Sequence, residues 1–322
     1  MKAPFDGSRR RMLAATLGAV ASITHAQPNI LRLVVPFAAG GITDQAARIV
    51  AERMSQQLGR PVIVDNRPGA GGRLGIDAVV KAPPDGNTLL FTNSSYSIYP
   101  VVNPKAGFDP AKALAPVSLC ATYGLQIVVS NALAVTTLPE LIAYAKKNPG
   151  KLSYGSAGVG SGAHFAGEFF KSLTGAHLVH IPYKSTSAAL NDVAGGQLDL
   201  TFDGSTKPLV DAGKLKLLAV TGAKRDARFP HAPTAAEAGL PPFASMQSWA
   251  GILAPAQTPQ ALLDPLNKAA TAAVADPGVQ KRFAELGLQT QGGAATRLAD
   301  AIAADMALYR HIAAEAHLRF DD

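Results

Sequence analysis

The sequence has little of several residue types on which common kinds of protein chemistry depend. Its 322 residues include one cysteine, Cys120, which excludes an internal disulfide and a metal or iron–sulfur site built from several thiolates. The seven histidines nowhere show the H-x-x-x-H or H-E-x-x-H spacing of zinc sites. Aromatic residues make up 6% of the chain, and no basic stretch is interleaved with them. We therefore expect no metal, no cofactor and no nucleic-acid partner.

The chain does contain enough apolar sequence to fold. Hydrophobic residues make up 48% of it and charged residues 16%, which excludes an intrinsically disordered protein. A chain of this length is expected to form about two domains, each large enough to bury its own core.

The N-terminal segment 1–26 has the pattern of a signal peptide. Three arginines at 9–11 precede an apolar run at 12–23, and 24–26 (THA) resembles a cleavage site. The order of residues 8–13 is also compatible with a twin-arginine signal, which would imply export in the folded state. We expect an exported protein that begins at Gln27.

The mature chain alternates predicted strands and helices, which is the pattern of an α/β protein. A strand at 30–37 runs into Gly40 and Gly41, after which Thr43 can cap a helix with Asp44 in its first turn. The same order recurs later in the chain, where a strand at 152–154, a glycine-rich loop at 155–162 and a helix follow one another.

Capping boxes mark further helix starts. They occur at 137–140 and 234–237, and Asp276 followed by Pro277 begins another predicted helix. Because ligands of open α/β sheets bind beyond the carboxyl ends of the strands, two halves that face each other would form a cleft lined by helix N-termini.

Such a cleft could hold an anion without a basic side chain. The first turn of a helix leaves backbone N–H groups without partners, and glycines allow an anion to approach them. Gly40 and Gly41 are also consistent with a simple tight turn, and Asp44 with an acid that complements the helix dipole. Tyr183 and Lys184, which follow a predicted strand, could line the wall of a cleft.

Two enzyme classes are weaker alternatives. Residues 158–163 match a loose dinucleotide fingerprint, but Lys184 stands near the place where an acidic residue is required. A serine hydrolase could use Ser156 or Ser161, although neither lies in a Gly-x-Ser-x-Gly motif. Its remaining triad members would be His164 and Asp203.

Five sequence motifs resemble those of one receptor family. Residues 33–44 (LVVPFAAGGITD) resemble the signature VPFxxGGxxD of the Bug family, the extracytoplasmic solute receptors of tripartite tricarboxylate transporters. The other matching motifs, in family order, lie at 65–72 (DNRPGAGG), 151–158 (KLSYGSAG), 180–184 (HIPYK) and 234–240 (TAAEAGL). The resemblance extends over essentially the whole mature chain, from Gln27 to about Ala314.

The resemblance implies a fold, a location and partners. It predicts a periplasmic binding protein of the two-lobe, type II-like fold, in which each lobe is a mixed sheet flanked by helices and the ligand cleft lies between them. One lobe would comprise 27–125 plus 250–322, and the other 126–249. The protein would be a monomer and not an enzyme, and would deliver a small carboxylate to membrane permease subunits. A receptor that reports its ligand to a sensor kinase remains an alternative.

The resemblance also assigns binding roles to individual positions. In the family, one carboxylate is held by backbone groups and ordered water at the turn matching 36–41. The second lobe contributes the loop matching 155–162, with further contacts near Ser94, Ser95 and Asp203. Together with the helix starts, this gives the predicted ligand-binding set Pro36, Phe37, Ala38, Gly40, Gly41, Thr43, Asp44, Ser94, Ser95, Gly155, Ser156, Ala157, Gly160, Ser161, Gly162, His164, Tyr183 and Asp203.

Several positions depart from the family pattern in these loops. Ala38 and Ala39 replace the common Pro-Pro pair, while Val159 and Gly162 stand where Asn and Thr are usual. The other departures are Gly204 after Asp203, Tyr99 before Pro100, and Ser185 after Lys184. Because polar partners are lost and an apolar wall is gained, we expect a less polar or bulkier acid, for example an aromatic one.

Overall fold

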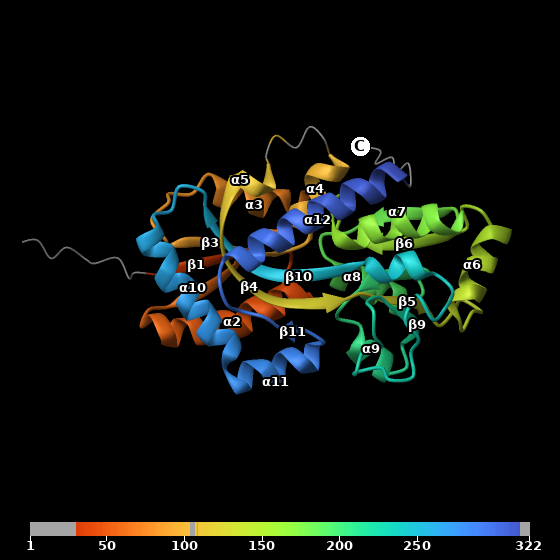
Figure 1. Cartoon of the computed structure of the whole chain (residues 1–322). Helices are drawn as coiled ribbons and strands as arrows, with labels where there is room; N and C mark the ends of the chain where they lie inside the picture. Colours follow the sequence, from red (N-terminus) through yellow and green to blue (C-terminus); the bar gives the residue numbers. More distant parts are fainter. Residues whose placement is uncertain (1–29, 104–106, 108, 316–322) are drawn as a thin grey trace, which may run out of the picture.

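The computed structural model describes residues 30–103, 107 and 109–315, and it contains two separate sheets flanked by helices. Figure 1 shows the two sheets side by side, with their helices around them. The predicted signal peptide, 1–26, lies outside the described residues. Among these residues, no helix is both long enough and apolar enough to cross a membrane.

The first sheet is mixed and has six strands. Strand β1 pairs in parallel with β2 and β3, whereas β10 runs antiparallel to β3 and β4. In spatial order the strands are β11 (Gln289–Thr290), β4 (Leu114–Gly124), β10 (Gln247–Pro255), β3 (Thr88–Asn93), β1 (Leu31–Val35) and β2 (Val62–Asn66). The associated helices are α2 (Ile42–Leu58), η1 (Ala70–Gly72), α3 (Arg73–Val80), α4 (Ser95–Val102), α5 (Pro110–Ala113), α10 (Gln260–Ala275), α11 (Pro277–Leu286) and α12 (Thr296–Glu315).

The second sheet is also mixed and has five strands. Strand β6 pairs in parallel with β7 and β8, and β5 lies antiparallel between β8 and β9. In spatial order the strands are β7 (Leu178–Pro182), β6 (Leu152–Ser156), β8 (Leu200–Asp203), β5 (Gln126–Ser130) and β9 (Leu215–Val220). Its helices are α6 (Leu138–Lys147), α7 (Gly162–Thr174), α8 (Thr186–Ala194), α9 (Lys207–Asp211) and η2 (Pro241–Ser245).

The chain passes between the two sheets at two places. Leu125 separates β4 from β5, and Met246 separates η2 from β10. These two passages lie next to each other, because Gln247 pairs with Gly124 in the first sheet. The two-lobe α/β fold expected from the sequence is thus confirmed, while the division into 27–125 plus 250–322 and 126–249 stays a prediction.

The C-terminal helix α12 connects the lobes by packing. It runs along the molecule toward α7 of the second sheet (Figure 1), and the ring of Tyr309 meets that of Phe165 edge-on at 4.9 Å. Both rings are buried. The buried apolar side of this helix, which includes Ile302, Met306 and Ile312 besides Tyr309, therefore packs against both lobes.

Two of the predicted helix starts need correction. Helix α2 has Gly41 as its N-cap with no side-chain cap, so Thr43 lies inside the first turn instead of capping it. The capping box at Thr234 does form both of its hydrogen bonds with Glu237, yet it closes a turn and begins no helix. Gly239, with a φ of +89°, and the prolines that follow prevent the helix from continuing.

The other capping predictions are confirmed. Thr137 and Glu140 form a capping box at the start of α6, and Asp276 caps α11 with Pro277 in its first turn. In addition, Ser161 caps α7 by accepting a hydrogen bond from the backbone N–H of His164. This last cap fixes the direction in which α7 leaves the glycine-rich loop.

Candidate functional site

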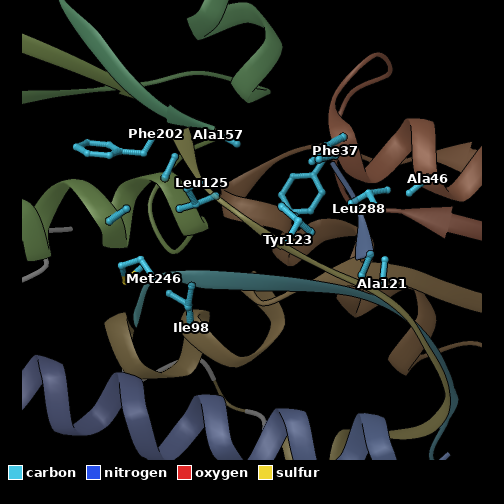
Figure 2. Packing of buried hydrophobic residues seen from close by; sticks show 14 of the residues in the cluster. Phe37, Ala46, Ile98, Ala121, Tyr123, Leu125, Ala157, Phe202, Met246 and Leu288 are labelled. Atoms are coloured by element: carbon cyan, nitrogen blue, oxygen red, sulfur yellow. The ribbon is translucent and has the colours of Figure 1, made fainter. Parts of the chain in front are cut away.

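A small cavity lies between the two lobes. The space in which the centre of a water molecule can move measures about 50 Å³. Figure 2 shows part of its apolar wall, with Phe37 and Tyr123 on the side of the first lobe and Ala157 and Phe202 on the side of the second. The cavity is lined by Phe37, Ala38, Gly41, Ile42, Thr43, Asn93, Ser94, Ser95, Ile98, Tyr123, Leu125, Ala157, Ser161, Gly162, Ala163, Ser185, Thr186, Phe202, Asp203, Gly204, Met246, Gln247, Ser248 and Tyr309.

Four helices begin at this cavity. Their first residues or N-caps line it, since α2 starts after Gly41, α4 after Ser94, α7 after Ser161 and α8 after Ser185. Each helix follows a strand that belongs to the parallel part of its sheet, so the four starts gather at facing sheet edges. Each start carries roughly half a unit of positive charge from the helix dipole.

The helix starts of the two lobes are in direct contact. The backbone N–H of Gly162, the first residue of α7, donates to the Ser95 hydroxyl at 3.2 Å. In the first lobe, the N-cap residues of α2 and α4 make no side-chain cap. In the second lobe, Ser161 and Ser185 cap α7 and α8, so the N–H of Gly162 is the first-turn donor of α7 that reaches across to the first lobe.

The cavity contains no basic side chain among the described residues that line it, and Asp203 is its single charged residue. Polar groups are instead supplied by hydroxyls and amides. Asn93, for example, donates to the Thr43 hydroxyl at 2.9 Å and accepts from the N–H of Ser95 at 2.9 Å. An anion bound here would be held by backbone N–H groups and neutral side chains.

Tyr123 brings a phenol to the cavity. Burial is the main reason that its pKa is raised to about 12, and hydrogen bonds with Ser248, Thr43 and Asn93 partly offset this effect. The phenol is therefore neutral at physiological pH and keeps its proton. It can donate a hydrogen bond to an acid bound beside it.

Ten of the eighteen positions predicted from the sequence line this cavity. They come from both lobes, and are Phe37, Ala38, Gly41, Thr43, Ser94, Ser95, Ala157, Ser161, Gly162 and Asp203. The other eight lie outside the lining, and are Pro36, Gly40, Asp44, Gly155, Ser156, Gly160, His164 and Tyr183. Since no ligand is present, the predicted binding role of all eighteen stays a prediction.

Asp44 holds the first glycine turn in place. Its carboxylate accepts from the N–H of Gly40 at 2.9 Å, from Asn66 at 2.8 Å and from Arg48 at 3.0 Å. Burial by itself would raise the pKa of Asp44, but the hydrogen bonds from Arg48, Gly40 and Asn66 outweigh it and lower the pKa. The structure therefore supports the dipole and turn-forming role of this residue.

A pair of histidines, His164 buried and His180 half-buried, lies behind the second glycine loop. His164 Nδ1 accepts from the N–H of Gly160 at 3.3 Å, and its ring lies 4.4 Å from that of His180. His180 Nε2 lies 2.6 Å from the Ser156 hydroxyl. Burial lowers the pKa of His164 to about 3 and that of His180 to about 4, so both rings are neutral and can accept hydrogen bonds.

This serine–histidine contact is positioned to support the loop. Ser156 is completely buried, and its hydroxyl also accepts from the N–H of Gly158 at 3.0 Å. The triad considered from the sequence would have paired Ser156 with His164, whereas the structure places His180 beside it. Tyr183, predicted to line the cleft, directs its hydroxyl to Asp192 at 2.6 Å.

The sequence reasoning missed the cavity residues on the passages between the lobes. Tyr123 and Leu125 lie at the first passage, Met246 and Gln247 at the second, and Tyr309 comes from the C-terminal helix. The apolar members of this set gave no local signal, because buried strands and helix stripes contain the same residue types, and a single glutamine such as Gln247 gives none either. Only the return of the chain between the sheets makes them neighbours of the glycine loops.

The sequence matches one protein family over most of its length. Residues 46–318 match the tripartite tricarboxylate transporter family receptor, TctC. A relative from Pseudomonas sp. (strain P51), a UPF0065 protein in the tcbD-tcbE intergenic region, is 36% identical over 302 residues. This alignment covers 91% of the present chain and 90% of the relative.

Solved structures of similar proteins share this fold. The periplasmic binding protein BugD is 34% identical with a TM-score of 0.87, covering 90% of this chain and 98% of BugD. An R. palustris protein solved with adipate is 34% identical with a TM-score of 0.86, covering 91% and 99%. MatC from Rhodopseudomonas palustris, with bound malate, is 30% identical with a TM-score of 0.85, covering 88% and 98%.

These likenesses agree with the architecture and with the motifs in the two glycine segments. The family and its solved members are solute-binding proteins. Solute binding therefore takes precedence over the serine-hydrolase and dinucleotide-binding alternatives considered from the sequence. The chain belongs to the TctC family, whose members, including the Bug proteins, are periplasmic solute receptors of tripartite tricarboxylate transporters.

Proposed function

We propose that this receptor binds a small organic acid in the cavity between its lobes and delivers it to the membrane permease of a tripartite transporter. One observation carries the proposal: helix starts from both lobes meet at one cavity, and the described residues that line it include no basic side chain. Hydrogen bonds to a charged group contribute about 1.5–3 kcal/mol each. Four of them amount to roughly 6–12 kcal/mol before ordering costs, and micromolar affinity corresponds to about 8 kcal/mol.

The polar groups at the centre of the cavity are covered while the lobes are in contact. Thr43, Ser94, Ser161 and Asp203, which line it from the two lobes, are each at most 4% exposed. Separation of the lobes would expose these groups to a solute. We therefore propose that the lobes open for binding and close over the bound acid.

Close backbone contacts between the lobes support this closure. A Cβ atom on Gly71 of the first lobe would lie 1.9 Å from the carbonyl oxygen of Val159 in the second. A Cβ on Gly160 would lie 2.6 Å from the ring of Tyr99. Glycines at these two positions let the lobe surfaces meet, which a hinge-closing receptor requires.

The transport partner and the oligomeric state follow from the family. The family is described as a receptor of tripartite tricarboxylate transporters, and relatives were solved with adipate and with malate. We propose that this chain likewise binds an acid, acts as a monomer and contacts permease subunits when loaded. Its export by the predicted signal peptide would place it in the periplasm with them.

A thermal unfolding assay tests the binding step. A ligand that binds only the folded state at about 100 times its Kd stabilises it by about 2.7 kcal/mol. For a chain of this size, that corresponds to an increase in Tm of roughly 5 °C. The panel contains mono-, di- and aromatic carboxylates, each with its uncharged amide as the matched control.

The proposal predicts that at least one acid raises the Tm and that its amide does not. The same acid should lower the radius of gyration measured by small-angle X-ray scattering, because the lobes close. An equal Tm increase with the amide, or no increase with any acid, would contradict the proposal.

A further inference from the structure

Arg228 is an arginine of the second lobe whose guanidinium reaches the first lobe. It lies in the segment between β9 and η2, and its side chain is 8% exposed. Its Nη1 donates at 2.6 Å to the carbonyl oxygen of Leu286, the last residue of α11, the helix at the bottom of Figure 1. This end of α11 carries roughly half a negative charge from the helix dipole, so a cation is favourable there. Arg228 thus makes a charged contact between the lobes.

Gly287 leaves room for this guanidinium. It is the C-cap of α11 and has the left-handed conformation, with a φ of +75°. A Cβ atom at this position would lie 2.0 Å from Cζ of Arg228. The guanidinium therefore occupies the space that a side chain at position 287 would need. The two lobes are complementary at this contact, because one supplies the cation and the other the room for it.

Asp226 orients Arg228 from within the second lobe. Its carboxylate accepts from Nε of Arg228 at 3.0 Å and from Nη2 at 2.6 Å. A bidentate pair of this kind fixes the plane of the guanidinium and directs Nη1 toward the first lobe. Because Asp226 and Arg228 belong to the same lobe, separation of the lobes would break the contacts with Leu286 and Gly287 and leave this ion pair intact.

The same guanidinium also holds a loop that lines the cavity. Its Nη1 donates to the carbonyl oxygen of Gly204 at 3.3 Å, and Gly204 lies in the cavity wall. Gln126, which is completely buried, adds a second link. In the orientation that satisfies both atoms of its amide, its oxygen accepts from Arg228 at 3.0 Å. Its nitrogen then donates to the carbonyl oxygens of Asp203 and Gly204, at 2.8 Å and 3.0 Å. Hydrogen bonds thus connect this loop to α11 of the first lobe.

We infer, on the basis of the proposed function, that Arg228 is a positioning residue that couples lobe closure to ligand binding. It does not line the cavity, so it acts through the loop at Asp203 and Gly204. In the closed receptor it holds this loop beside the bound acid and adds a contact between the lobes that the open receptor lacks. A contact made only in the closed state slows the dissociation of the acid and leaves its association unchanged.

Two variants remove this contact, one from each lobe. Arg228→Met removes the guanidinium and retains an apolar stem of similar length. Gly287→Ala keeps the arginine but places a Cβ where the guanidinium lies, so it tests the same contact should Arg228→Met fold poorly. The Tm of each unliganded variant reports its folding.

Each variant has a matched control. Arg225→Met removes an equal charge, but Arg225 is paired within the second lobe with Glu237 at 2.9 Å. Gly59→Ala alters the C-cap of α2, where φ is +62° and a Cβ would meet no atom within 4 Å. It therefore measures the cost of backbone strain alone.

Calorimetric titration gives the Kd, and surface plasmon resonance gives the association and dissociation rates. The probes are adipate and malate, with which relatives were solved, together with succinate and benzoate. We expect Arg228→Met to weaken binding about 10- to 100-fold, as for the loss of one charged hydrogen bond, through faster dissociation. Gly287→Ala should act in the same direction, and the two controls should stay within about twofold of wild type. The double variant should bind no more weakly than Arg228→Met, because both substitutions remove one contact.

The opposite outcomes overturn the inference. An unchanged Kd in Arg228→Met, or a loss caused by slower association, would refute the coupling to closure. An equal loss in Arg225→Met would assign the effect to net charge, and additive losses in the double variant would show that the two substitutions act separately. All of these leave acid binding by the wild type intact. Absence of binding by the wild type across the carboxylate panel would refute the proposed function together with this inference.

Discussion

Replacement of Gly162 by proline removes one backbone N–H group from the cavity without altering a side-chain charge. Gly162 is the first residue of α7, a position at which proline is favoured because its N–H has no partner within the helix. The preceding residue, Ser161, is extended with φ of −75° and ψ of 158°, which a following proline requires. A Cβ at position 162 would meet no atom within 4 Å. The backbone at position 162 therefore accepts a proline, whose ring Cδ takes the place of the N–H and requires the Ser95 hydroxyl to turn aside.

The expected loss of affinity follows from the strength of one hydrogen bond. The N–H of Gly162 donates to the Ser95 hydroxyl in this structure, and we propose that the carboxylate of the ligand takes this donor in the complex. A hydrogen bond to a charged group contributes about 1.5–3 kcal/mol. Its removal should weaken the binding of the acid about 10- to 100-fold.

Gly162→Ala is the matched control, because it adds a Cβ atom and retains the N–H. We expect its Kd to stay within about twofold of wild type, since a change into open space costs at most about 0.5 kcal/mol. Both variants are titrated calorimetrically with the acid that gives the largest thermal shift. A proline variant that keeps its Tm and binds as tightly as the alanine variant would show that this N–H does not hold the ligand.

Two further substitutions test the closure of the lobes and the charge state beside the cavity. Gly71→Ala places a Cβ against the Val159 carbonyl, so we expect titration calorimetry to show about 5- to 100-fold weaker acid binding. Gly59→Ala has the same φ of +62° but open space around it, and an equal effect there would point to backbone strain instead of closure. Burial raises the pKa of Asp305, which accepts from the Trp249 indole at 2.7 Å, to about 7. Because the folded-state pKa is raised, the stability is highest below the unfolded pKa and falls as pH rises toward 7. Between pH 5 and pH 8, the free energy of unfolding measured in urea should fall by about 2–3 kcal/mol more for the wild type than for Asp305→Asn. Equal decreases in the two proteins would exclude the ionisation of Asp305 as the cause.

The two glycine segments could be predicted from the sequence because their signals are local. A strand, glycines and a helix start stand next to one another in the chain, and a strand that ends before a helix places that helix start at the sheet edge. The sequence did not reveal that Gly41 and not Thr43 caps α2. Thr43 uses its hydroxyl as an acceptor for Asn93, which lies fifty residues away. A long-range hydrogen bond of this kind has no local signature.

The rest of the cavity depends on tertiary structure. Tyr123 and Met246 reach it because the chain crosses twice between the sheets, and Tyr309 reaches it because α12 packs against both lobes. An apolar residue on a strand or a helix stripe predicts burial but does not indicate which neighbours it will meet. The capping box at Thr234 illustrates the opposite limit, since both of its hydrogen bonds form although no helix begins there.

A crystal structure of the receptor with a bound acid tests most directly whether amide hydrogens from both lobes hold the ligand. We expect carboxylate oxygens within about 3 Å of backbone N–H groups at the starts of both α2 and α7, with no lysine or arginine in contact. An acid held by a basic side chain, or bound to one lobe alone, would contradict it.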